Sequence, residues 1–167
     1  MTRSLRSFSE STGAGTTAVD LVRLQIYLKG DNVKTIEKII AMFGGTDGLY
    51  VSITNEPYMR LVIEHIGDGP HGRTAISVAH YYELNGDLCQ DPEMCFEAES
   101  MPDGLVMNPY MFQMANPPVY QEVSDDAQGV ALARELREFA TTWDNNLRDQ
   151  GFLESAERLR SSSAVQS

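Results

Sequence analysis

The stretch that decides the fold is AISVAHYYELNGDLCQDPEMCFEA, residues 75–98, in which apolar and polar side chains alternate on both sides of Asn85-Gly86. Alternation with a period of two is typical of a half-buried strand, and Asn-Gly is a preferred dipeptide of tight hairpin turns. The pattern predicts two antiparallel strands, residues 75–84 and 93–98. One face of the first strand carries four residues: Ile76, Val78, His80 and Tyr82.

Working outward, shorter apolar runs predict four more strands, at residues 49–53, 59–64, 106–114 and 119–123. The loop 67–72 is dense in turn-forming residues and too short for a parallel crossover, which favours antiparallel pairing of its flanking strands. A symmetric hairpin there would place Arg60 opposite His80 and disfavour the protonated imidazole. Pro109 favours an edge position for the strand that contains it.

Helical spacing of apolar residues returns at both ends of the chain. Residues 19–43 predict two short helices or one broken helix, and residues 127–148 predict a long helix with Asp125 and Asp126 at its N-terminus. The predicted fold is α+β: an antiparallel sheet of about five strands, preceded by one or two short helices and closed by a long C-terminal helix. We expect a flexible tail at 1–17, one domain at 18–153 and a disordered Ser-rich tail at 154–167.

The composition is that of a soluble protein of the cytoplasm. Hydrophobic residues make up 42% of the chain, and no apolar run is long enough to span a bilayer. The N-terminus has no apolar signal region, and the two cysteines, Cys89 and Cys95, are simplest to interpret as free thiols in a reducing compartment. No cofactor is indicated, and the sequence does not indicate an oligomeric state.

The charge is concentrated in the middle of the chain. The formal net charge is -11, and the sixty residues between Arg73 and Arg134 contain no lysine or arginine. These residues hold ten carboxylates: Glu83, Asp87, Asp91, Glu93, Glu97, Glu99, Asp103, Glu122, Asp125 and Asp126. A field of one sign repels phosphate backbones and attracts basic surfaces. It therefore argues against direct nucleic-acid binding and favours a basic protein partner.

The predicted binding surface within this field comprises Tyr81, Asp87, Asp91, Glu93, Glu97 and Glu99. Whether the acids form one face or only a solubilising coat depends on the fold.

An enzyme is the alternative. Dinucleotide-binding, phosphate-loop and serine-hydrolase motifs are missing, so the candidates lie in the central hairpin. His80, with Glu83 and Asp87 as catalytic candidates, could act as a general base, or His80 with Asp87, Asp91 and Glu93 could support a metal-dependent reaction. The competing interpretation is that His80 packs in the core, because it shares a face with apolar residues. No metal site is assigned.

Several strings resemble an uncharacterised bacterial domain family that is carried on plasmids, integrative elements and phages. The strings that carry the resemblance are Asn55–Met59, Ile76–Glu83, Asn85–Leu88, Asp91–Met94, Tyr120–Glu122, Trp143, Asn146-Leu147 and Gln150–Phe152. The resemblance spans about residues 19–152 and implies a single compact domain in a mobile-element context, with no assigned activity. We therefore expect a non-enzymatic interaction protein of a mobile element, for example an inhibitor of host defence or an accessory factor.

Overall fold

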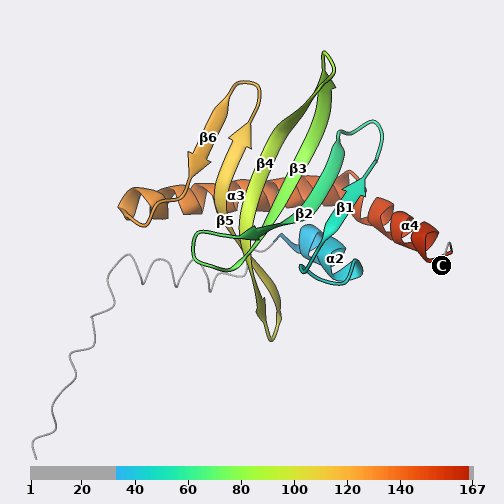
Figure 1. Cartoon of the computed structure of the whole chain (residues 1–167), viewed down its shortest axis with the longest axis horizontal. Coiled ribbons are helices and arrows are strands. Elements are labelled where there is room, and N and C mark those ends of the chain that lie inside the picture. Colours follow the sequence, from blue (N-terminus) through green and yellow to red (C-terminus); the bar gives the residue numbers. More distant parts are fainter. Residues whose placement is uncertain (1–32, 166–167) are drawn as a thin grey trace, which may run out of the picture.

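The computed structural model describes residues 33–165 and confirms the α+β class (Figure 1). Its elements are α2 (Lys34–Met42), β1 (Tyr50–Ile53), β2 (Arg60–Asp68), β3 (Thr74–Leu84), β4 (Asp87–Met101), β5 (Gly104–Met114), β6 (Val119–Glu122), α3 (Ala127–Asp149) and α4 (Phe152–Ala164). No helix in this range is long and apolar enough to cross a membrane.

The six strands form one antiparallel sheet in the order β1-β2-β3-β4-β5-β6, so each strand pairs with its neighbours in sequence. The edge position expected for the strand with Pro109 is wrong, because β5 lies between β4 and β6. The register of β4 against β5 shifts between Cys95 and Phe96, and Phe96 faces Pro109 there. A bulge disrupts the ladder locally, which allows an internal strand to accept a residue without an N–H donor.

The molecule has two layers, because the helices cover one face of the sheet (Figure 1). Alternation along the strands directs the apolar side chains Ile63, Val78 and Phe96 into this interface, where each has 0% exposure. Trp143 and Leu147 of α3 belong to the same core. The opposite face of the sheet is called the open face below, because no described helix packs on it.

A buried carboxylate from α3 holds the first helix in place. Helix α2 has no side-chain cap of its own, but Asp144 accepts hydrogen bonds from the backbone N–H groups of Thr35 (3.0 Å) and Ile36 (2.9 Å). These are donors that a helix N-terminus leaves without intrahelical partners. Asp144 is 4% exposed, so the two bonds form away from water and tie the two helices together.

Two further expectations are corrected. Arg60 pairs with Tyr81 rather than with His80, because the turn closes with Asp68 opposite Thr74 and the register then shifts by one residue at His65/Gly67. The Arg60 guanidinium lies 5.8 Å from the Tyr81 ring centroid. The Ser-rich segment expected to be disordered forms most of α4. The helical prediction for residues 19–32 lies outside the described residues, whereas the rest of that pattern forms α2.

Candidate functional site

His80, the catalytic candidate from the sequence, lies in the core. It is 6% exposed, its Nδ1 lies 3.1 Å from the backbone oxygen of Met59, and its ring is 5.5 Å from the rings of both Trp143 and Phe152. Burial lowers the pKa of His80, because the charged imidazolium is poorly solvated there. A neutral ring packed among aromatic side chains fits a structural role.

The acidic residues predicted to act with His80 in catalysis or metal binding do not form a cluster around it. Glu83 and Asp87 are exposed near the tip of the β3–β4 hairpin, which projects beyond the other strands in Figure 1. Glu93 points to the open face, away from His80. Among residues 33–165, no three His, Cys, Asp or Glu side chains gather closely enough to hold a metal ion.

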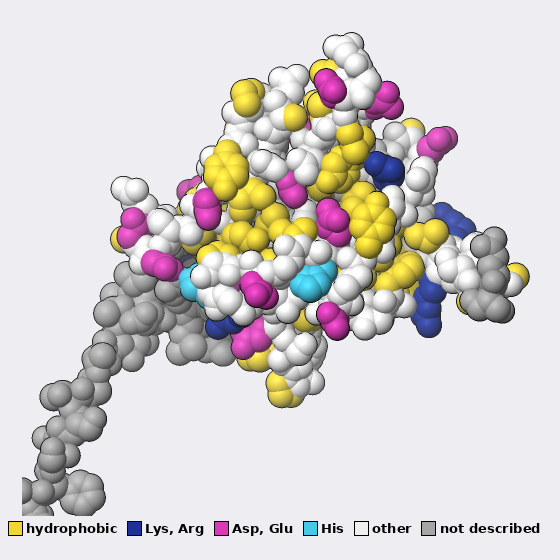
Figure 2. Space-filling model, in the orientation of Figure 1, with side chains coloured by type: hydrophobic (Ala, Val, Ile, Leu, Met, Phe, Trp, Pro, Cys, Tyr) yellow, Lys and Arg dark blue, Asp and Glu magenta, His cyan; other side chains and the backbone are white. Residues whose placement is uncertain are grey.

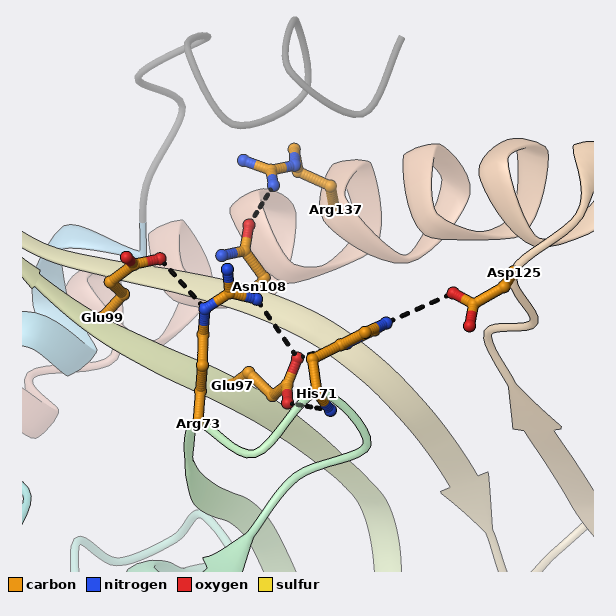
Figure 3. A network of polar contacts seen from close by, with 7 residues as sticks. All are labelled: His71, Arg73, Glu97, Glu99, Asn108, Asp125 and Arg137. Atoms are coloured by element: carbon orange, nitrogen blue, oxygen red, sulfur yellow. Dashed lines mark hydrogen bonds and ion pairs between the residues drawn. The ribbon is translucent and has the colours of Figure 1, made fainter. Parts of the chain in front are cut away.

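A polar network that the sequence did not reveal joins the β2–β3 loop to β4 (Figure 3). Glu97, which is 2% exposed, accepts a hydrogen bond from the backbone N–H of His71 (2.7 Å), and its Oε2 lies 2.7 Å from His71 Nδ1. Gly69 makes this approach possible, because a Cβ at that position would lie 2.4 Å from Glu97 Cγ. The loop thus closes over the Glu97 carboxylate.

The network extends in two directions from Glu97. The other ring nitrogen of His71, Nε2, lies 3.2 Å from Asp125, and the Nε of Arg73 lies 3.2 Å from Glu99. Hydrogen bonds to Glu97 and Asp125 raise the pKa of His71, because they favour the protonated ring. An imidazolium held by carboxylates at both nitrogens acts as a cationic clasp. In this geometry, neither nitrogen is available to take a proton from a substrate.

A cavity of about 290 Å³ lies beside this clasp, between the β2–β3 loop, β5 and the first turns of α3. Arg137 reaches the cavity from α3 and donates a hydrogen bond to Asn108 Oδ1 (2.7 Å), as Figure 3 shows. The Nδ2 of Asn108 is buried and has no hydrogen-bond partner. The charged side chains of its lining are Arg73, Arg137 and the carboxylate of Glu97, which His71 already contacts.

The open face has a different character. Figure 2 views it directly: apolar side chains gather over the centre of the sheet, Asp and Glu lie among and around them, and Lys and Arg lie toward the edges of the view. Strand alternation and register place eight of its residues: Tyr50, Glu64, Tyr81, Glu93, Cys95, Gln113, Tyr120 and Glu122. Tyr110 is the extra residue of β5 at the bulge, and its side chain contacts that of Cys95. Tyr50 and Tyr120 are each 64% exposed.

Glu93 stands at the centre of the open face, paired with Ala79 of β3 and Gln113 of β5. It is 8% exposed, and its carboxylate accepts hydrogen bonds from the Ser77 hydroxyl (2.6 Å), the Cys95 thiol (3.9 Å) and the Gln113 amide. All three donors are neutral, and Glu93 forms no ion pair with any described residue. The carboxylate is therefore hydrogen-bonded but not neutralised by a cation.

The pKa values of Cys95 and Tyr81, which lie next to Glu93, are raised. Burial, together with the nearby charge of Glu93, raises the pKa of the Cys95 thiol to about 12. Burial also raises the pKa of Tyr81, with contributions from Glu93 and Glu64. A second negative charge is therefore disfavoured at the centre of the open face, first because these groups are partly desolvated and second because the carboxylates nearby repel it.

A family described as a domain of unknown function (DUF6908) matches residues 34–153. The chain belongs to this family. The DUF6908 match covers the whole sheet, α2 and α3, so both the clasp and the open face lie within it. No curated protein and no solved structure shows a significant match to the chain.

Within the DUF6908 domain, the ten central carboxylates do not form a single face. Glu97 lies on the same side of β4 as Glu93, but the β2–β3 loop closes over it, and it belongs with Glu99 and Asp125 to the His71–Arg73 clasp. Glu93 and Glu122 lie on the part of the open face outside the clasp. The others lie elsewhere: Glu83, Asp87 and Asp103 on hairpin ends, Asp91 beside the bulge of β4, and Asp126 at the cap of α3. Of the predicted binding residues, only Tyr81 and Glu93 share the centre of the open face.

Proposed function

We propose that the protein is a non-enzymatic interaction protein that binds a basic protein partner through the open face of its sheet. The observation that carries this proposal is the charge of that face. Glu64, Glu93 and Glu122 form no ion pair with described residues, and Arg60, on the same face, lies over the ring of Tyr81 rather than beside one of these carboxylates. A partner with Lys or Arg side chains would complement this surface.

Composition supports the same proposal. Tyrosines are enriched in protein interfaces because the ring buries a large area at low entropic cost and the hydroxyl can still form a hydrogen bond. The open face offers Tyr50 and Tyr120 at its margins and Tyr81 and Tyr110 nearer the centre. We place the protein in the bacterial cytoplasm and in a mobile-element context; its free cysteines and the sequence resemblance support these two inferences respectively.

The test uses two variants with the same change in net charge. The open-face variant combines Glu64→Gln with Glu122→Gln, and the control combines the exposed hairpin residues Asp87→Asn and Asp103→Asn. The probe is a fluorescein-labelled octapeptide in which glycine alternates with lysine or arginine, and its binding is followed by fluorescence anisotropy at low and high salt.

We expect the open-face variant to bind roughly fivefold more weakly than the unmodified protein, from the loss of two partly exposed ion pairs. The control should bind within about twofold, and salt should weaken all binding. Equal losses in the two variants would mean that the peptide responds only to net charge. That result, or no binding to the unmodified protein at low salt, would refute the proposal.

A further inference from the structure

We infer that Glu93 is the recognition point for a single arginine side chain of the partner. This inference rests on the proposed function and makes it specific, because it names the residue at the centre of the interface and the chemical group that it receives. The guanidinium would lie over the centre of the sheet, paired with the Glu93 carboxylate and bordered by Tyr81 and Tyr110.

The first argument comes from the burial of Glu93. A carboxylate that is 8% exposed has lost most of its hydration, and its three hydrogen bonds, from Ser77, Cys95 and Gln113, come from neutral groups. Each carboxylate oxygen can accept more than one hydrogen bond, so acceptor capacity remains. A buried carboxylate gains more from a cation than an exposed one, because water screens the pair less.

The second argument comes from the groups around Glu93. The Tyr81 hydroxyl accepts a hydrogen bond from Gln90 (3.0 Å), and Gln90 also accepts one from Gln113 (3.2 Å). These contacts fix the Tyr81 ring beside Glu93 before any partner arrives. A preorganised site loses little side-chain entropy on binding, which favours recognition at this point of the face.

The third argument selects arginine over lysine. A guanidinium is planar, stacks on aromatic rings and can donate two parallel hydrogen bonds to a carboxylate, whereas an ammonium is a compact and strongly hydrated charge. The chain already uses the Tyr81 ring in this way, because its own Arg60 lies 5.8 Å from that ring's centroid. The open face therefore combines an acceptor and an aromatic surface that suit a guanidinium.

The experiment compares Glu93→Gln with Glu122→Gln, which makes the same change of charge at an exposed position on the same face. Two probes are used: an octapeptide of alternating glycine and arginine, and the corresponding lysine peptide. Affinities are measured by isothermal titration calorimetry, and the melting temperature of each variant is recorded to check folding.

We expect Glu93→Gln to weaken binding of the arginine peptide about thirtyfold or more, as for a buried charge pair that loses one partner. Glu122→Gln should weaken it about fivefold or less. The unmodified protein should prefer the arginine peptide to the lysine peptide, a comparison that needs no substitution and therefore stands even if Glu93→Gln fails to fold.

Three outcomes would overturn the inference. Equal losses in the two variants would show that Glu93 acts only through the general field, and equal affinities for the two peptides would show that the guanidinium is not selected. In both cases the open face would still bind basic partners, so the proposed function would survive. Absence of binding by either peptide at low salt would remove both.

Discussion

Asp144 should contribute strongly to stability, because it is the acceptor for the first turn of α2. In Asp144→Ala, the backbone N–H groups of Thr35 and Ile36 would stay buried at 3% and 0% exposure without an acceptor. Each buried unsatisfied donor costs about 1–3 kcal/mol, so the loss should be about 2–6 kcal/mol. Asp144→Asn keeps one acceptor oxygen and should cost roughly half as much.

The assay is urea unfolding followed by the fluorescence of Trp143, which is the only tryptophan and belongs to the core beside these residues. Asn145→Ala is the control, because Asn145 is exposed on the same helix and its substitution should change the free energy of unfolding by about 0.5 kcal/mol or less. A loss below about 1 kcal/mol for Asp144→Ala would refute the reasoning, since the two N–H groups would then have found other partners.

Two more predictions concern titration and reactivity. His71 has a raised pKa, so its contribution to stability is complete below its unfolded pKa of about 6.5 and is lost as pH rises through the folded value. His80 has a lowered pKa, so its contribution is present above about 6.5 and is lost as pH falls through the folded value. The melting temperature of the unmodified protein should fall as pH rises through the folded pKa of His71, and this fall should be absent in His71→Gln. If the melting temperature of His71→Gln depends on pH in the same way as that of the unmodified protein, the clasp is contradicted. Cys95, with a pKa of about 12, should react with iodoacetamide only after unfolding, whereas the partly exposed Cys89 should react in the native state. Mass spectrometry measures the alkylation rate of each cysteine. Equal rates for the two cysteines in the native protein would contradict the burial of Cys95.

The strands were predictable because their signals are local. The alternation around Asn85-Gly86 specifies a hairpin, and the apolar stripe of α3 follows from its helical period. Register was not predictable to one residue, since it depends on where the turn closes, with Asp68 opposite Thr74, and on the bulge at His65/Gly67. Together these two features place Arg60 opposite Tyr81, and neither leaves a strong sequence signal. The position of β5 was missed for a similar reason, because another bulge accommodates Pro109 inside the sheet.

The site was harder to predict because its contacts join distant residues. His71 and Glu97 are 26 positions apart, and His71 and Asp125 are 54 apart, so no spacing motif connects them. The sequence identified the excess of carboxylates but not their division between a paired clasp and an unpaired open face. The position of Glu93 on the open face could have been predicted, because alternation along β4 places Glu93 and Cys95 on the face opposite Met94.

The central claim is that a basic partner binds the open face and not the clasp or the hairpin ends. The most direct test is an NMR titration of the isotope-labelled protein with the alternating glycine–arginine octapeptide. If the partner binds the open face, the amide signals of Tyr81, Glu93 and Gln113 should shift most, while those of His71, Asp87 and Asp103 should change little. Shifts concentrated at His71 or at the hairpin ends, or spread evenly over the domain, would contradict it.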